Sequence, residues 1–337
     1  MFFNAETWPA IKARALSDGY AHVRLGFLLK AADAYPAEPV CSGYGPVTTP
    51  PSTPISNVNE FGAQAARCAL AWRFTGNPDY LVKARKMLVA SATAYRAAYA
   101  NRRAVHWYSE RRILALCAYD WIFEGLTPDQ RREIIVPLVE HVEEIQPGSG
   151  KPAVTRRNTG GTKTGFYGVA SLLWYAGIAA HGDGFCDGLA RSHLEKGYSI
   201  NLEMLDFRAE SAGDDGALVS GVPAYSMGAY PWAHFNFFHT YLSATGENIA
   251  VRYPGLALFP NWIWWTWIPN ARDPLRPLQF GWGDDQHEGN LLDVKRLYQH
   301  MTQYMFFFRE ADPEAARLAA TLRDLAPIRD LSENWPH

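Results

Sequence analysis

Apolar residues recur at the spacing of an amphipathic helix along most of the chain, and no segment alternates apolar and polar residues as a strand would. The expected helices are two short ones within 7–36, then 60–74, 78–95, 106–123, 128–145, 165–180, 185–207, 224–244, 291–308 and 313–325. The stretch 250–290 carries five prolines and is expected to be broken, because proline removes a helical backbone donor. Thr127 before Pro128 is a typical helix start. The pattern predicts an all-α fold.

Helix pairs joined by short polar turns recur roughly every 40–50 residues, a period typical of helical repeats. The turns at 75–77 (TGN), 181–183 (HGD) and 245–247 (TGE) are similar in sequence. A helix pair can bury its apolar face only against neighbouring pairs. About six pairs favour closure into an (α/α) toroid, and we expect a single toroid domain over residues 1–337. The long loops expected at one end of this toroid are 40–57, 147–162, 208–223 and 269–290.

Charge and motif content narrow the expected partners and cofactors. The net charge is −2, so the chain lacks the basic excess typical of nucleic-acid binding. The longest aromatic run, 262–267, is too short to span a membrane. No glycine-rich nucleotide loop follows a strand, and the four cysteines lack metal-binding spacing, so we expect no cofactor, no metal and buried free thiols. No signal peptide is visible, which predicts a cytoplasmic protein, or a periplasmic or secreted one whose signal has been removed.

The aromatic content has two interpretations. The chain contains 12 Trp, 17 Tyr and 17 Phe. Aromatic rings bury much surface in cores. They also stack on the apolar faces of sugars, so a Trp-rich carbohydrate cleft is the second interpretation.

Three segments together resemble a known enzyme family. They are 112–128 (RILALCAYDWIFEGLTP), 212–225 (AGDDGALVSGVPAY) and 280–285 (FGWGDD). They resemble the "AYDWLYD…LTP", "DGG…EGPGY" and "FGDSDD" phrases of heparinase II/III-like and alginate-lyase-like polysaccharide lyases. The order and spacing are similar across most of the chain. The resemblance implies an (α/α) toroid followed by a β-sandwich, and since the chain stops about where the sandwich would begin, the sandwich would be a partner domain absent from this chain.

The resemblance implies β-elimination in a uronic-acid-containing polysaccharide or oligosaccharide, such as alginate or a glycosaminoglycan. The C5 proton of a uronate is acidic only when the neighbouring carboxylate is neutralised. In this family one tyrosine transfers protons, often beside an Asn-His pair. Tyr225 matches that tyrosine, and it follows a Gly/Pro loop at an expected helix start, where the helix dipole favours a phenolate. Tyr230 is the alternative, one turn further on.

The loop 147–162 lies where the family has its Asn-His element. Asn158 is expected to hold the uronate carboxylate, with Arg156 or Arg157 pairing it and Lys163 following. The expected histidine is absent, because Thr159 follows Asn158. His106 is the candidate replacement for the missing imidazole. A solvated basic loop and a structural histidine are the alternatives.

Five further residues are expected to contact substrate. His234 lies among aromatic residues on the 224–244 helix, and a position in the core is the alternative. The others belong to the acidic loop after residue 280 and are Trp282, Asp284, Asp285 and His287. In a lyase such acidic groups would bind hydroxyls or hold arginines.

Two other functions remain open from the residues alone. An inverting (α/α) glycoside hydrolase would use Asp214 or Asp215 with Asp284 or Asp285 as acid and base. A catalytically inactive glycan-binding toroid would need none of these. Turn formation is the structural explanation of the acidic loops, because Asp and Gly favour turns.

Overall fold

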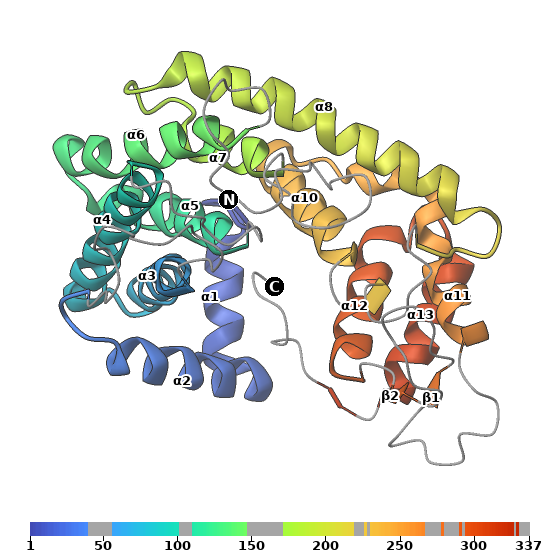
Figure 1. Ribbon diagram of the computed structural model, residues 1–337. Helices are drawn as coiled ribbons and strands as arrows, with labels where there is room; N and C mark the ends of the chain where they lie inside the picture. The colour runs from blue at the N-terminus through green and yellow to red at the C-terminus, as the bar shows by residue number, and fades with distance from the viewer. Residues whose placement is uncertain are drawn as a thin grey trace. The chain divides into compact units, whose positions relative to one another are not determined.

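The computed structural model describes residues 1–39, 56–100, 110–146, 171–218, 226–227, 230–266, 278–279, 290–291, 294–326 and 328–329. Helices dominate these residues, which confirms the expected all-α fold (Figure 1). The described residues form two compact units, unit 1 up to Ser199 and unit 2 from Ile200 onward. Closure into one toroid domain over 1–337 stays a prediction. No helix in the described part is long and apolar enough to cross a membrane.

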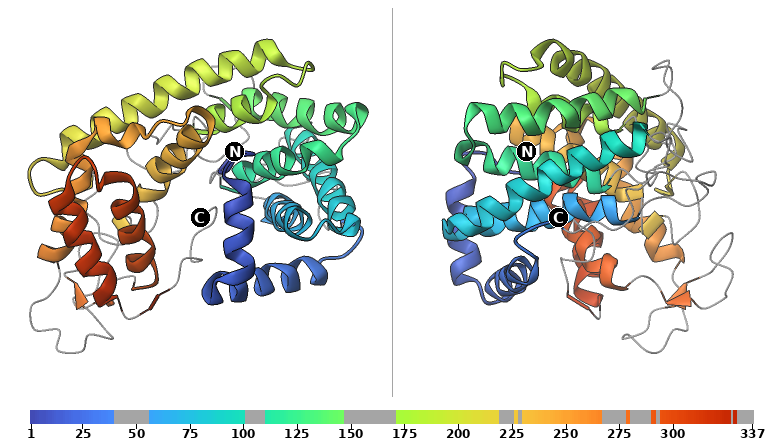
Figure 2. Two further views of the ribbon diagram at one scale, coloured as in Figure 1. Left: turned by 180° about the vertical axis from the view of Figure 1, so that it is seen from behind. Right: turned by 60° about the vertical axis from the view of Figure 1, so that its left-hand side comes forward.

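Unit 1 is a set of helices packed around α3. Its elements are α1 (Trp8–Ser17), α2 (Gly19–Ala34), α3 (Ser56–Thr75), α4 (Pro78–Ala100), α5 (Glu110–Ile122), the 3-10 turn η1 (Phe123–Gly125), α6 (Pro128–Glu144), α7 (Leu172–Ala180) and the first part of α8 (Asp187–Ala212). Helix α3 packs against α4 and α5, and α6 packs against α4 and α7 (Figures 1 and 2). The buried alanines of α3 permit these close contacts, and they are Ala63, Ala65, Ala66, Ala69 and Ala71.

Local capping explains where several helices begin and end. Thr127 and Gln130 form a capping box at the start of α6, and Pro128 occupies the first turn, as expected. Each of the three similar turns has a glycine at positive φ: Gly76 at 73°, Gly182 at 81° and Gly246 at 78°. In the turns of Gly76 and Gly246, the preceding threonine donates to the carbonyl four residues back and accepts from the N–H two residues ahead. The sequence similarity of these two turns therefore corresponds to one shared hydrogen-bond pattern.

Gly62 on α3 sets how closely α5 can approach. A Cβ added there would lie 2.1 Å from the backbone oxygen of Arg111 and 3.3 Å from the Cβ of Ala115. Gly62→Ala should therefore force α3 and α5 apart and lower the free energy of unfolding by about 1–3 kcal/mol. Urea unfolding followed by circular dichroism measures this loss.

Gly26 on α2 provides the matched control for Gly62. No atom lies within 4 Å of a Cβ added at Gly26. Gly26→Ala should raise the free energy of unfolding by about 0.5–1 kcal/mol through helix propensity alone. Equal stability of the two variants would mean that the α3–α5 contact is not limited by Gly62.

Unit 2 contains the rest of α8, then α10 (Tyr230–Thr245), the 3-10 turns η3 (Ile249–Arg252) and η4 (Pro254–Leu258), α11 (Phe259–Thr266), α12 (Val294–Phe308) and α13 (Pro313–Leu325). Helix α13 packs against α11 and α12. The helix α11 corrects the expectation of a broken stretch over 250–290, because Pro260 lies in its first turn, where no helical donor is lost. The strands β1 (Leu278–Gln279) and β2 (Asn290–Leu291) pair antiparallel and are too short to show alternation in the sequence.

Stacked aromatic rings form the core of unit 2. The fully buried rings are Trp232, Phe235, Phe237, Phe238, Phe259, Tyr304, Phe307 and Phe308. The ring centroids of Phe235 and Tyr304 lie 5.0 Å apart in an edge-to-face arrangement, a favourable geometry for aromatic pairs. Many of the aromatic residues are therefore part of the core, which was the first of the two interpretations of the aromatic content.

The described cysteines are free thiols. Cys68 and Cys117 are buried and Cys186 is half-buried, while Cys41 lies outside the described residues. Burial raises the pKa of Cys68 and of Cys186 to about 11, and it raises the pKa of Cys117 further. These thiols are protonated at neutral pH and are poor nucleophiles.

Candidate functional site

Most of the predicted site residues lie outside the described part of the chain. These are His106, Arg156, Arg157, Asn158, Lys163, Tyr225, Trp282, Asp284, Asp285 and His287. Tyr230 is the first residue of α10. The side chains of Asp214, Asp215 and His234 are described. The described residues next to Tyr225 in the sequence are Ser226 and Met227, and both belong to unit 2.

His234 lies in the core of unit 2 beside a buried arginine. It is completely buried on α10, and Arg208 on α8 is 1% exposed. The Nδ1 atom of His234 lies 2.8 Å from Nη1 of Arg208. Burial, and then the charge of Arg208, hold the pKa of His234 well below its usual range, so the imidazole is neutral and accepts a hydrogen bond from the guanidinium. This environment fits the core alternative for His234, and its contact with substrate stays a prediction.

Helix α12 adds two more buried polar residues, His300 and Tyr304, one turn apart. The rings of Tyr304 and His234 lie 6.3 Å apart. Burial raises the pKa of Tyr304 strongly, and the charge of Arg208 acts in the opposite direction. We call Arg208, His234, His300 and Tyr304 the buried polar cluster. It joins α8, α10 and α12 in the interior of unit 2.

The buried polar cluster holds the backbone just after the predicted catalytic tyrosine. Nε2 of His300 lies 2.6 Å from the carbonyl oxygen of Met227, two residues beyond Tyr225. Ser226 and Met227 are both completely buried. Because a buried hydrogen bond to a carbonyl fixes both partners, α12 sets the position of the backbone at Met227.

Sequence reasoning missed Arg208, His300 and Tyr304 because polar residues in a core follow no motif. One signal was available: Arg208 lies four and three residues after Met204 and Leu205, which are both completely buried. At that spacing Arg208 shares their helix face. A charged residue on a buried face needs polar neighbours, which only the tertiary structure identifies.

Asp214 and Asp215 lie in an exposed turn after α8. Oδ1 of Asp215 accepts a hydrogen bond from the backbone N–H of Ala217 at 3.0 Å. Gly216 has a φ of 84°, and a Cβ there would lie 2.1 Å from the carbonyl oxygen of Leu258. The geometry gives Asp215 a turn-forming role, which is the structural explanation considered for this acidic loop.

Unit 1 contains a similar buried trio. Nε of Arg112 donates to Nε2 of His141 at 3.2 Å, and the ring of Tyr95 stacks on His141 at 4.3 Å. All three residues are buried, and burial and the charge of Arg112 hold the pKa of His141 well below its usual range. Arg112 opens the "AYDW" segment of the family resemblance. The side chain of Arg112 is buried inside unit 1 and does not face solvent.

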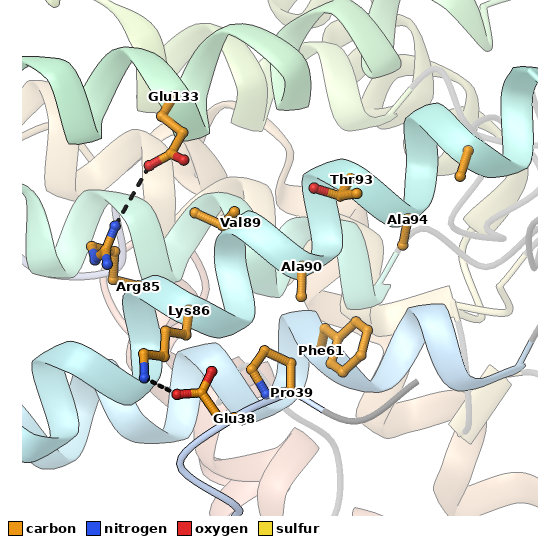
Figure 3. A pocket seen from close by; sticks show the side chains of 11 residues that line it. Glu38, Pro39, Phe61, Arg85, Lys86, Val89, Ala90, Thr93, Ala94 and Glu133 are labelled. Atoms are coloured by element: carbon orange, nitrogen blue, oxygen red, sulfur yellow. Dashed lines mark hydrogen bonds and ion pairs between the residues drawn. The ribbon is translucent and has the colours of Figure 1, made fainter. Parts of the chain in front are cut away.

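A pocket of about 560 Å³ lies on unit 1 between the end of α2 and helices α3, α4 and α6 (Figure 3). Phe61 and Val89 contribute to its apolar lining. Lys86 forms an ion pair with Glu38. Nη1 of Arg85 lies 3.5 Å from Oε2 of Glu133, so each of these cations faces a carboxylate. The pocket contains none of the predicted site residues and presents balanced charge, so we assign it no chemistry.

Among the described residues no group of His, Cys, Asp and Glu is arranged to hold a metal ion. The chain matches no protein-family model and no curated protein.

Proposed function

We propose that the chain cleaves a uronic-acid-containing polysaccharide or oligosaccharide by β-elimination. The observation that carries the proposal is the ordered resemblance of 112–128, 212–225 and 280–285 to heparinase II/III-like and alginate-lyase-like enzymes. The all-α fold supports it, because the resemblance implies a helical catalytic domain. The hydrogen bond from His300 to Met227 supports it too, since a proton-transfer residue at Tyr225 requires a fixed backbone.

In this proposal Asn158, with Arg156 or Arg157, neutralises the uronate carboxylate and makes the C5 proton acidic. Tyr225 or His106 removes that proton. The electron pair of the C5–H bond forms the C4=C5 double bond, and the C4–O bond breaks. Tyr225 then gives a proton to the leaving oxygen. Tyr230, Trp282 and the residues of the acidic loop would position the neighbouring sugars.

A panel of uronic-acid polymers tests the reaction class. Elimination leaves a conjugated C4=C5 double bond, so we expect new ultraviolet absorbance to rise together with new reducing ends. Alginate, pectate and several glycosaminoglycans should be compared, because the net charge of −2 does not select one polymer. New reducing ends without ultraviolet absorbance would instead indicate hydrolysis by Asp214 or Asp215 with a partner in the acidic loop. Binding without product on any polymer would indicate an inactive glycan-binding protein.

A further inference from the structure

The outer face of α11 carries two exposed tryptophans. The buried residues of this helix are Phe259, Pro260, Trp262, Ile263 and Thr266. On the opposite side Trp264 is 45% exposed and Trp265 is 72% exposed. An amphipathic helix ordinarily places polar residues on that side. The indoles of Trp264 and Trp265 are therefore apolar surface that the core of unit 2 does not bury.

Hydrogen bonds fix the orientation of Trp265. Its Nε1–H donates to Oδ1 of Asn261 at 3.2 Å, one helical turn back. Nδ2 of Asn261 in turn donates to the backbone oxygen of Asp215 at 3.4 Å. Because the polar atom of the indole is satisfied within the protein, the exposed surface of Trp265 is an apolar ring held in one orientation. A surface ordered in advance loses little entropy on binding.

The Asp214–Asp215 turn lies against the start of α11. Gly216 touches Leu258, the residue before the helix, so closely that no side chain fits between them. Both carboxylates of the turn are exposed. Exposed carboxylate oxygens accept hydrogen bonds from hydroxyl groups and repel anions. The backbone oxygen of Asp215 accepts a hydrogen bond from Asn261, so this acidic turn adjoins the residue that orients Trp265.

We propose that Trp265, with Asn261 and the Asp214–Asp215 turn, binds a neutral sugar residue of a glycan. The apolar C–H face of a pyranose stacks on the exposed indole, and its hydroxyls donate to the carboxylates. The negative charge of the turn disfavours a uronate, a nucleic acid or an anionic membrane at this position. The site binds glycan whether or not the chain cleaves it, so the inference goes beyond the proposed elimination and does not require it.

Binding of neutral and anionic hexasaccharides tests this site. Cellohexaose and mannohexaose are titrated against the full chain, with the indole N–H signals followed by NMR, and oligomannuronate and oligogalacturonate serve as anionic probes. We expect a neutral hexasaccharide to shift the Trp265 signal. Trp265→Ala should weaken its binding by about tenfold or more. Asn261→Ala keeps the indole of Trp265 but removes the hydrogen bond that orients it, so we expect a smaller loss of affinity for the hexasaccharide.

Phe27 provides the matched control, since it is an exposed aromatic residue, 58% accessible, on α2 of unit 1. Phe27→Ala should bind the neutral hexasaccharide as the wild type does. The site is refuted if neither neutral hexasaccharide binds the wild type or if Trp265→Ala binds as tightly. It is also refuted if only the uronate probes shift Trp265, an outcome that leaves the proposed elimination standing. A Trp265 signal that depends on protein concentration would overturn the inference as well, because the face would then join two copies of the chain.

Discussion

Tyr225→Phe is expected to lower kcat on the cleaved uronic-acid polymer by about 10²–10⁴-fold, the usual contribution of a positioned acid–base group. The substitution removes one hydroxyl, so the fold should be kept and KM should change little. The measurement is the initial rate of ultraviolet absorbance increase, with circular dichroism as the check on folding. The reason for the selective effect is that proton transfer contributes in the transition state and not in the bound ground state.

Tyr230→Phe is the matched control for Tyr225→Phe, because it removes the same hydroxyl five residues later in the sequence. It should keep near wild-type kcat, and any loss should appear in KM, because Tyr230 would position a neighbouring sugar and transfer no proton. Arg157→Ala and Asn158→Ala should weaken both binding and turnover, since each would contact the carboxylate before and during the reaction. If Tyr230→Phe is inactive and Tyr225→Phe is active, the catalytic tyrosine is Tyr230. If both tyrosine variants remain active and Asp215→Asn or Asp285→Asn is inactive, the enzyme is a hydrolase and the elimination proposal is wrong.

Acidification should destabilise the protein steeply below about pH 6.5, because burial holds at least four of the described histidines neutral in the folded protein. Burial is the main cause in each case: it lowers the pKa of His239 to about 4 and of His300 to about 3, and it holds those of His141 and His234 well below the usual range. The unfolded chain therefore binds more protons than the folded chain below about pH 6.5. As the pH is lowered below about 6.5, the free energy of unfolding decreases, and the contribution of each histidine levels off once the pH falls below its pKa in the folded protein.

Each buried histidine should contribute a slope of about 1 kcal/mol per pH unit, so four together approach the whole stability of a typical domain within about two pH units. Urea unfolding at a series of pH values between neutrality and acid measures the slope. His300→Gln keeps a donor for the carbonyl of Met227 and removes one titrating group. It should reduce the slope by about one proton equivalent, whatever it does to stability at neutral pH. The same substitution at exposed His22, His22→Gln, provides the control for the effect of the amide itself. An unchanged slope in His300→Gln would show that His300 is not neutral and buried in solution.

Local signals in the sequence were enough to predict most helices. The last helix was expected over 313–325 and spans Pro313–Leu325, because Asp312 caps it and Pro313 opens it. The start of α6 was equally well marked by Thr127. Helix α11 was missed because several prolines around it suggested a break, whereas one at the second residue of a helix is compatible with it.

The candidate site was far less accessible to sequence reasoning. The resemblance could point to Tyr225, but the backbone at Met227 is held by His300 of α12. Arg208 of α8 instead contacts the side chain of His234 on α10. The contact of His300 with Met227 joins residues 73 apart, and that of Arg208 with His234 joins residues 26 apart. Both follow from packing, which no local pattern encodes. The same holds for Asn261, whose bond to the Asp215 backbone makes Trp265 a fixed surface.

The matching turns at Gly76 and Gly246 have a consequence for folding kinetics. Every hydrogen bond described in them joins groups no more than four residues apart. Such contacts require almost no loop closure, and chains rich in them fold fast. One of these turns belongs to each unit. We therefore expect this helix end to form in each unit without first requiring a long-range contact.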